Sequence, residues 1–343
     1  MEPARYWHQE PEGGICCDLC PHRCHIPDER TGRCRVRRVA DGQLWAWGYG
    51  QLSSMQMDPI EKKPLYHFHP GTQILSVGGW GCNFSCVFCQ NWSISQKTMA
   101  GGHVISPEHV VEEARRHTSV GVAYTYNEPI INVEYVIETA VRARAVGLTN
   151  VLVTNGFVNS DPAADLLDVI DAVNVDLKSM DDTFYRKECG GRVEPVKAFC
   201  RQAVEAGCHV EITNLVIPGL NDADEQVARL AGWIAETLGR SVPMHLSAYR
   251  PMYKMHVPPT PAATLVRAHA LCRERLDYVY LGNVMTREGC NTVCPECGAV
   301  LIARIGYGTR VTGLSAGACT ACGRRFDGVT GRSGSDSGSG RES

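Results

Sequence analysis

The sequence predicts an α/β protein built around an incomplete TIM-like barrel, with a cysteine-rich module at each end. The first observation is a series of short β-rich runs between residues 73 and 282 that alternate with helical stretches, which is typical of repeated βα units and a parallel sheet. The second is that polar residues follow nearly every run, which favours a barrel over a doubly wound sheet. The third is that most of the seventeen cysteines fall into three blocks, which predicts three separate metal sites.

The β-rich runs define the strands that we expect in the barrel. They are QILSV (73–77), VGVAYTY (120–126), NVLVT (150–154), VNVDL (173–177), HVEITNLVI (209–217), MHLSAY (244–249) and YVYLG (278–282). Between them, Ser106 predicts a helix start, because Pro107 and Glu108 place a proline and an acid in the first turn. Helices over 131–146 and 195–206 are each expected to end at the glycine that follows.

Chain length and composition predict one main domain with smaller accessories. A chain of 343 residues that is 44% hydrophobic can bury one substantial core. We expect an N-terminal four-cysteine module with a lead-in segment at 1–71, the barrel at 72–285, and a zinc-ribbon-like module at 286–330. The remainder, 331–343, is rich in Gly and Ser and is expected to be disordered.

Charge and hydropathy exclude several classes of partner. The net charge is −3 and the pI about 6.5, so the chain offers no basic field for a nucleic-acid backbone. Apolar runs are too short to cross a membrane, and the N-terminus lacks the features of a signal peptide. We therefore expect a cytoplasmic protein whose cysteines are reduced and bind metal.

Cys82, Cys86 and Cys89 form a CxxxCxxC loop directly after the first predicted strand. A [4Fe-4S] cluster ordinarily takes four thiolates, so three cysteines leave one iron open. An open iron can chelate the amino and carboxylate groups of S-adenosylmethionine (SAM), and an electron delivered through it cleaves SAM to methionine and a 5′-deoxyadenosyl radical. The alternatives are a zinc site or a cluster that takes a fourth cysteine from elsewhere in the chain.

The same spacing recurs at Cys290, Cys294 and Cys297, so spacing alone does not decide between the two copies. The second copy has Glu296 where the first has Phe88. No βα units follow it, and another CxxC pair does. We therefore place the open cluster at the first copy.

Polar side chains at the predicted strand ends are the candidates for SAM and substrate binding, because these ends converge at one rim of a parallel barrel. The alternative is that they are solvated loop residues. The candidates are Glu128, Asn155, Asp176, Lys178, Asn214 and His245.

The pattern resembles the radical SAM superfamily, and in particular the activating enzymes of glycyl-radical enzymes such as pyruvate formate-lyase. The resemblance implies that Phe88 lies against the SAM adenine and that Glu128 accepts hydrogen bonds from the SAM ammonium. It also implies that Asn155, Asp176 and Lys178 contact SAM or the substrate. The chain departs from the superfamily's Gly-Gly-Glu-Pro motif in the segment YTYNEP (124–129), where Tyr126 and Asn127 replace both glycines.

A narrower resemblance joins the motifs into one set. DPIEKKPLYHFHPGT (58–72), the block GCNFSCVFCQNWSISQ (81–96), YNEP, and CDLCPHRC with GRCRVR near the N-terminus resemble the AmmeMemoRadiSam radical SAM enzymes. Membership implies a (β/α)6 barrel, a functional link to Memo-like and AMMECR-type proteins, and an electron donor such as flavodoxin or ferredoxin.

The N-terminal cysteines have the spacing of a closed four-thiolate site. Cys17, Cys20, Cys24 and Cys34 form CxxCxxxCx9C, and Cys16, His22 and His25 are spare ligands. The spacing allows either a tetrahedral zinc site or an auxiliary iron-sulfur cluster.

At the C-terminus, two CxxC pairs are separated by a β-rich segment, the pattern of a zinc ribbon. Its ligands would be Cys294, Cys297, Cys319 and Cys322. We favour a structural or protein-docking role for this module over nucleic-acid binding.

The predicted activity is that of a radical SAM oxidoreductase, which cleaves SAM and abstracts hydrogen from an unknown substrate, with a protein side chain or glycine as the first candidate. An alternative is radical modification of a small molecule in a pathway with Memo-like and AMMECR-type proteins. A second alternative is a non-enzymatic metalloprotein scaffold.

Overall fold

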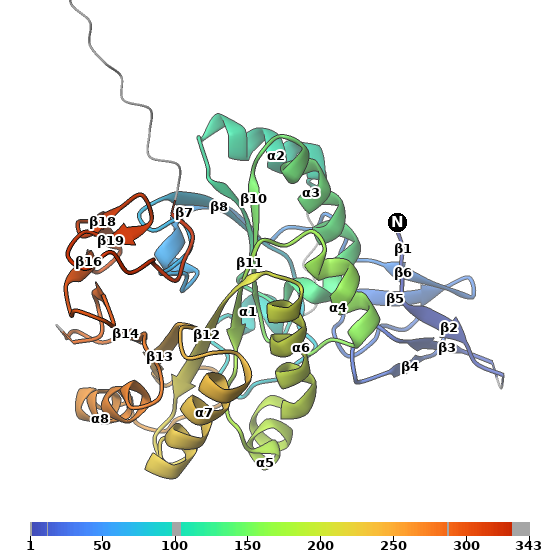
Figure 1. The fold of residues 1–343 in the computed structure, drawn as a ribbon. Coiled ribbons are helices and arrows are strands. Elements are labelled where there is room, and N and C mark those ends of the chain that lie inside the picture. The colour runs from blue at the N-terminus through green and yellow to red at the C-terminus, as the bar shows by residue number, and fades with distance from the viewer. Residues whose placement is uncertain (1, 12, 98–103, 287, 331–343) are drawn as a thin grey trace, which may run out of the picture.

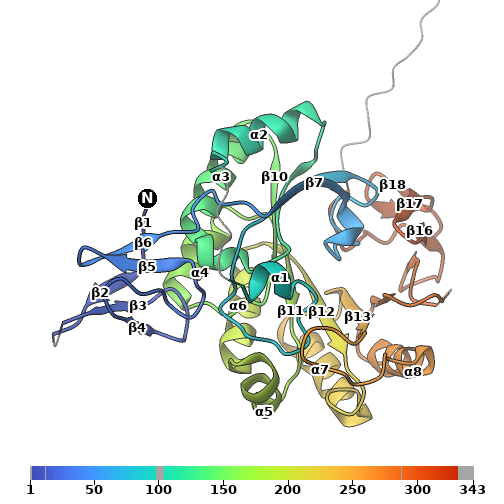
Figure 2. The same cartoon turned by 180° about the vertical axis from the view of Figure 1, so that it is seen from behind.

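The fold is described from a computed structural model that covers residues 2–11, 13–97, 104–286 and 288–330 (Figure 1). The tail 331–343, predicted to be disordered, lies outside the described residues. A central sheet wrapped by helices carries one small β module at each end of the chain (Figures 1 and 2).

The central sheet has eight strands in the order β14-β13-β12-β11-β10-β9-β8-β7. Each neighbouring pair from β8 to β14 is parallel, and β7 (Ser54–Pro59) runs antiparallel to β8. All seven predicted runs form strands. Their bounds are β8 Gln73–Gly78, β9 Gly121–Tyr124, β10 Thr149–Thr154, β11 Ala172–Asp176, β12 His209–Val216, β13 Met244–Ala248 and β14 Val279–Gly282.

Helices connect successive parallel strands and cover the outside of the sheet (Figure 1). Ser106 caps the first long helix as predicted, because its Oγ accepts a hydrogen bond from the backbone N–H of His109. Gly147 and Gly207 follow the two helices predicted to end there and have φ of 80° and 79°. The helices are α1 Trp92–Ser95, α2 Pro107–Arg116, α3 Val133–Ala145, α4 Ser160–Leu167, α5 Asp182–Phe184, α6 Val193–Glu205, α7 Asp224–Thr237 and α8 Ala262–Arg273.

The lead-in segment closes one end of the barrel interior. Ile60, Leu65 and Phe68 are buried in one apolar cluster with inward-facing residues of the first strands, among them Ala123 and Val151. Burial of each of these side chains stabilises the fold by about 1.5–3 kcal/mol, because it removes apolar surface from water. The segment therefore fills this end of the barrel interior with apolar side chains.

The C-terminal module bridges the gap between the edge strands β7 and β14, which do not pair with each other among the described residues. His67 contacts both sides of this gap. Its Nε2 lies 2.6 Å from the hydroxyl of Tyr280 in β14, and its Nδ1 lies 2.8 Å from the backbone oxygen of Asp327. Phe68 also forms a β-bridge with Val329. Tertiary contacts rather than strand pairing thus close the barrel wall.

Glu211 is a fully buried carboxylate in β12 that holds the lead-in segment to the barrel. It accepts hydrogen bonds from the backbone N–H groups of Tyr66 and His67, at 3.0 and 2.7 Å. It also contacts the rings of His209 and His245, at 2.9 and 2.6 Å. Burial opposes ionisation, but the hydrogen bonds and charges of the two histidines hold the pKa of Glu211 well below its usual range.

The two end modules consist of short antiparallel strands. The N-terminal module has two sheets, in the orders β1-β6-β5 and β2-β3-β4. The C-terminal module has the sheets β15-β16-β17 and β18-β19. Their bounds are β1 Glu2–Pro3, β2 Trp7–Gln9, β3 Ile15–Cys17, β4 Cys24–Ile26, β5 Arg37–Ala40, β6 Gln43–Ala46, β15 Thr292–Val293, β16 Val300–Ile305, β17 Gly308–Val311, β18 Leu314–Ser315 and β19 Ala318–Cys319.

In the part of the chain that the structure describes, no helix is both long enough and apolar enough to span a membrane.

Candidate active site

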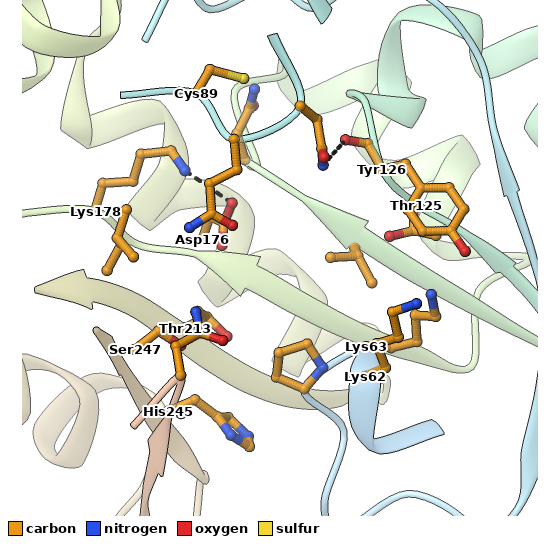
Figure 3. Close-up of a pocket in the computed structure, with 18 of the residues that line it drawn as sticks. Lys62, Lys63, Cys89, Thr125, Tyr126, Asp176, Lys178, Thr213, His245 and Ser247 are labelled. Carbon is orange, nitrogen blue, oxygen red and sulfur yellow. Dashed lines mark hydrogen bonds and ion pairs between the residues drawn. The ribbon is translucent and has the colours of Figure 1, made fainter. Parts of the chain in front are cut away.

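A cavity of about 1390 Å³ opens at the carboxyl ends of the parallel strands, the end opposite the apolar floor. Most of the predicted site residues line it. Figure 3 shows Lys178 reaching Asp176 on one side of the cavity and Lys62 and Lys63 on the other. The predicted residues at its wall are Cys82, Cys86, Phe88, Cys89, Glu128, Asn155, Asp176, Lys178 and His245.

The cysteine loop follows β8 and is held by backbone hydrogen bonds. The N–H groups of Ser85 and Val87 donate to the carbonyls of Cys189 and Glu188, at 2.8 and 3.0 Å. Cys82, Cys86 and Cys89 all face the cavity, yet their three sulfurs, all within the described chain, do not all lie within 4.8 Å of one another. A single metal ion would need shorter spacing. The loop therefore fits a polynuclear cluster in which each thiolate binds a different iron.

Cys189, which no sequence motif singles out, lies directly against this loop. It is fully buried in the short helix η3 (Tyr185–Cys189). A hydrogen bond with its thiol lowers the pKa of Cys86. The lower pKa favours the thiolate form, which is the form that binds iron. No spacing pattern links Cys189 to the triad, so the contact becomes visible only in the folded chain.

Asn127 holds the glycine-rich segment before the cluster loop. Its side-chain oxygen accepts from the N–H of Gly79 at 2.9 Å, and its amide donates to the carbonyls of Trp80 and Gly81 at 3.1 Å. The neighbouring Tyr126 has a φ of 72°, the left-handed region that glycine adopts most easily. Tyr126 thus keeps a glycine-like backbone at this position of the motif, and Asn127 adds side-chain contacts that a glycine lacks.

Glu128 is a buried carboxyl group at the cavity wall and is 2% exposed. Its Oε1 accepts from Thr154 Oγ at 2.6 Å and from the N–H of Ile130 at 3.1 Å, and its Oε2 accepts from the N–H of Asn155 at 2.8 Å. Burial raises its pKa to about 7, although these hydrogen bonds oppose the rise. A carboxylate has about four acceptor positions, so one stays open toward the cavity.

Lys178 and Asp176 form an ion pair at the end of β11, with Nζ and Oδ2 2.9 Å apart. Burial alone would lower the pKa of Lys178, but the negative charges of Asp176 and Cys86 raise it well above its usual value. Lys178 therefore keeps its positive charge beside the cluster loop, partly balanced by Asp176.

Asn155 contacts the cluster loop directly. Its Nδ2 lies 2.8 Å from Oδ1 of Asn83 and 3.7 Å from the sulfur of Cys82. Asn83 in turn donates to the carbonyl of Phe157 at 2.8 Å. The end of β10 is thus hydrogen-bonded to the first cysteine of the triad as well as to Glu128.

Two candidates lie differently from what the strand-end rule predicts. Asn214 is not brought to the cavity: Thr213 and Leu215 line it, and since side chains alternate along a strand, Asn214 projects to the other face. There it donates to the carbonyl of Leu177 at 2.8 Å. His245 lines the cavity, but its Nε2 is occupied by Glu211, so it lies toward the barrel floor.

The lead-in segment could line the substrate entrance or cap the barrel floor, and the contacts of Lys62 and Lys63 bear on both roles. Both line the cavity, and both Nζ atoms lie 2.7 Å from the carboxylate of Asp58. Tyr126 also donates its hydroxyl to Asp58. The segment therefore does both, because its apolar side chains fill the floor and its lysines face the open end.

The C-terminal cysteines form a compact group. The sulfurs of Cys294 and Cys322 are 3.6 Å apart and those of Cys297 and Cys319 are 3.7 Å apart, and all four lie within 4.8 Å of one another. Four thiolates around one tetrahedral ion at 2.3 Å would be about 3.8 Å apart. The group therefore has the size of a mononuclear metal site.

Comparison with known proteins places the site in a family. Residues 78–231, which include the cysteine triad, Glu128 and Lys178, match the Radical SAM superfamily. The uncharacterized protein MJ0808 of Methanocaldococcus jannaschii is 40% identical over 333 residues, which cover 95% of this chain and 99% of that protein. Pyruvate formate-lyase 1-activating enzyme of Escherichia coli is 29% identical over 185 residues, 51% of this chain and 73% of that enzyme.

Among solved structures, a domain of the pyruvate formate-lyase-activating enzyme from Bacteroides vulgatus is similar, with a TM-score of 0.43 and 21% identity. The match covers 48% of this chain and 99% of that one. The sequence matches, together with three cysteines spaced for a cluster at the mouth of a parallel barrel, lead to one conclusion. Residues 78–231 form a Radical SAM domain, the chain is related in sequence to the activating enzymes of glycyl-radical enzymes, and it is an enzyme of the radical SAM type.

Proposed function

We propose that the chain cleaves SAM reductively and then abstracts a hydrogen atom from a protein, as an activating enzyme does. The observation that carries this proposal is that the cysteine triad, Glu128 and the Lys178–Asp176 pair line one cavity. When bound at the triad, a [4Fe-4S] cluster with one free iron supplies the electron that cleaves SAM to methionine and a 5′-deoxyadenosyl radical.

The residues around the triad can bind and orient SAM. The open acceptor position of Glu128 suits the SAM ammonium, and Lys178 suits its carboxylate. Asn155 fixes the loop that carries Cys82. Phe88 is 3% exposed and lines the cavity, where its ring can lie against the adenine.

The size and rim of the cavity favour a protein substrate. Its volume of about 1390 Å³ exceeds the roughly 300–1,000 Å³ of a typical small-molecule pocket. Met285 and Tyr307 line it and are 101% and 54% exposed, and the adjacent Ile305 is 91% exposed. Apolar side chains gathered at the rim of a pocket typically contact another macromolecule. Radical modification of a small molecule is the second candidate, favoured by the enclosed basic wall at Lys62 and Lys63.

Three further assignments belong to this proposal. The group of four C-terminal thiolates suits a structural zinc ion, because its sulfur spacing is that of a tetrahedral site. Reduced cysteines at metal-ligand spacing suit the cytoplasm. Memo-like and AMMECR-type proteins are the proposed pathway partners, and flavodoxin or ferredoxin the proposed electron donor, by resemblance.

Deuterium transfer distinguishes a protein substrate from a small one. Cluster-loaded enzyme is incubated with SAM, a reductant and a lysate of its own organism grown on deuterated medium, divided into macromolecular and low-mass fractions. We expect deuterium in 5′-deoxyadenosine only with the macromolecular fraction. Deuterium only with the low-mass fraction would replace the proposal by the small-molecule alternative.

A pair of matched variants tests whether a protein substrate docks at the rim of the cavity. Tyr307→Ser should lower deuterium transfer from the macromolecular fraction several-fold, because it removes an apolar contact beside the cavity. Val141→Ser should not, since Val141 is exposed to a similar extent, 52%, but lies on α3 away from the cavity. Equal effects of the two variants would contradict docking at this rim.

A further inference from the structure

The sulfurs of the N-terminal module surround a common space but do not form a close group. Cys17, Cys20, Cys24 and Cys34 all line one small cavity of about 10 Å³, room for about one water molecule. All four lie within the described residues, and no three of their sulfurs are within 4.8 Å of one another. A zinc ion bonded to four thiolates needs sulfurs about 3.8 Å apart and leaves no such space at its centre.

The two other cysteine groups of the chain can be compared with the N-terminal module, one for a single metal ion and one for a cluster. The C-terminal group, with sulfur pairs at 3.6 and 3.7 Å, has the spacing of one metal ion. The triad at Cys82 has wider spacing around a shared cavity, as a cluster requires. The N-terminal module resembles the triad in both respects, except that it offers four thiolates, enough to coordinate every iron of a [4Fe-4S] cluster.

Arg37 supplies an independent observation at the N-terminal cavity. It lines the cavity and is 1% exposed, and its Nη1 pairs with Glu134 at 2.9 Å. Its Nε is buried without a hydrogen-bond partner among the described residues. A buried N–H group of this kind is costly unless something accepts its hydrogen bond. A sulfide or thiolate of a cluster would be such an acceptor, and the anionic cluster would also balance the charge of Arg37.

The N-terminal cavity lies immediately behind the loop of the SAM-binding cluster. Asn83, next to Cys82, lines it. His22 contacts the carbonyl of Asn83 at 2.8 Å. Gly81 packs so closely on the Cys34 carbonyl oxygen that a Cβ there would overlap it. Residues 81–83, which include Cys82 of the triad, therefore contact the N-terminal module directly.

We propose that Cys17, Cys20, Cys24 and Cys34 bind a second, fully coordinated [4Fe-4S] cluster that passes electrons to the cluster at Cys82, Cys86 and Cys89. A low-potential one-electron carrier protein reduces the N-terminal cluster from 2+ to 1+. That cluster returns to 2+ as the SAM-binding cluster goes from 2+ to 1+. The relay rests on the proposed function, whereas the presence of the second cluster does not.

Metal analysis of the wild-type chain tests the second cluster without any variant. Anaerobically reconstituted protein should contain about eight irons, about eight sulfides and about one zinc per chain. About four irons with about two zincs would overturn the proposal. After reduction, two sets of paramagnetic resonance signals are expected, and SAM should change only one, because only the triad leaves an iron open.

Variants then assign each signal. The triple variant Cys82→Ala, Cys86→Ala and Cys89→Ala should keep about four irons and the signal that SAM does not change. Cys24→Ala should lose that signal and keep the other one. The matched control is Cys16→Ala: Cys16 is adjacent to Cys17 but points away from the cavity, toward Asp18. Loss of the SAM-insensitive signal in the triple variant would overturn the assignment.

The relay predicts a dependence on the reductant. In Cys24→Ala, 5′-deoxyadenosine formation driven by flavodoxin should fall at least tenfold, about 1.4 kcal/mol, while formation driven by dithionite, a small reductant that reaches the open cavity, should persist. Unchanged flavodoxin-driven formation would overturn the relay. A wild-type protein with about eight irons that forms no 5′-deoxyadenosine with either reductant would instead contradict the proposed function.

Discussion

Glu128 combines deep burial with a position at the cavity wall, and this combination makes its ionisation sensitive to pH. Its pKa is raised to about 7, so the carboxyl group is half neutral at that pH. A SAM ammonium binds the ionised form, because a neutral carboxyl group lacks the charge and one acceptor position. Acid should therefore weaken SAM binding through Glu128.

We expect the titration of Glu128 alone to make the dissociation constant of SAM about tenfold larger at pH 6 than at pH 8, measured on cluster-loaded protein. Glu128→Gln should bind SAM more weakly and lose this part of the pH dependence, because an amide does not titrate in this range. Calorimetric titration of both proteins at both pH values measures the dissociation constants. Comparing the two proteins cancels the contribution from protonation of SAM itself. Parallel pH profiles would show that Glu128 does not bind the ammonium.

Substitution of Asn127 tests the side-chain contacts made at a position where the superfamily motif has a glycine. Asn127→Ala removes three hydrogen bonds to the segment 79–81, and a buried group left unpaired costs about 1–3 kcal/mol. We expect lower iron retention on dilution and a several-fold slower SAM cleavage. Asn91→Ala, which removes one hydrogen bond to the Tyr126 carbonyl at a more exposed position, should have a smaller effect on both. Equal losses would contradict a special role of Asn127.

Sequence reasoning located the residues that reach the cavity from strand ends but missed those that act across loops. Glu128, Asn155 and Lys178 follow strands directly, and parallel strands end at one rim. Asn127 was visible only as a departure from a motif, and no sequence pattern singled out Cys189. Their contacts depend on how distant loops approach each other, which no local pattern records.

At the scale of elements, His67 joins the lead-in segment to β14 and to the C-terminal module. Burial lowers its pKa to about 3, so it is neutral in the folded protein. An unfolded chain takes up a proton on this residue below about pH 6.5, and acid therefore favours unfolding. The stabilising contribution is complete above pH 6.5 and is lost as the pH falls toward 3.

Between pH 7 and pH 5 this residue should cost about 2 kcal/mol of stability. His67→Phe removes hydrogen bonds to Tyr280 and Asp327, so it should be less stable at pH 7 but lose less stability on acidification. Midpoints of thermal unfolding at both pH values measure the difference. An equal acid shift in both proteins would show that His67 is not the titrating group.

The strands were predictable because each is a short β-rich run bounded by turns, and every predicted run contains one. β9 ends two residues early, at Tyr124, because the chain then turns through the positive φ of Tyr126. The apolar plug formed by Ile60, Leu65 and Phe68 could not be predicted. Its residues have no strand or helix periodicity, and their partners lie on several strands.

At the scale of the whole molecule, the C-terminal module completes the barrel wall, so the metal ion proposed for its four cysteines should stabilise more than the module. Cys297→Ser should remove the bound ion and expose residues 288–330 to protease, because a small metal module draws its folding energy from the ion. Zinc content and limited proteolysis measure both effects. Cys290→Ser is the matched control, because Cys290 has the same CxxxCxxC spacing but lies outside the group of four. Equal zinc loss in both variants would contradict the assignment.

The order of modules along the chain followed from cysteine spacing, but their arrangement did not. The cysteine spacings that begin at Cys17 and at Cys294 indicate which residues act together as metal ligands. The chemistry of thiolate ligands then limits which metals can bind. That residues 81–83 lie against the N-terminal module, and that Val329 pairs with Phe68, depends on packing between segments far apart in sequence.

The central claim is that the cavity at Cys82, Cys86 and Cys89 supports reductive cleavage of SAM. Formation of 5′-deoxyadenosine by anaerobically reconstituted protein with SAM and dithionite tests it most directly. The wild-type chain and Cys272→Ala, a buried cysteine on α8 outside the cavity lining, should both form 5′-deoxyadenosine, and Cys86→Ala should form none. Absence of product from cluster-replete wild-type protein, or equal product from Cys86→Ala, would contradict the claim.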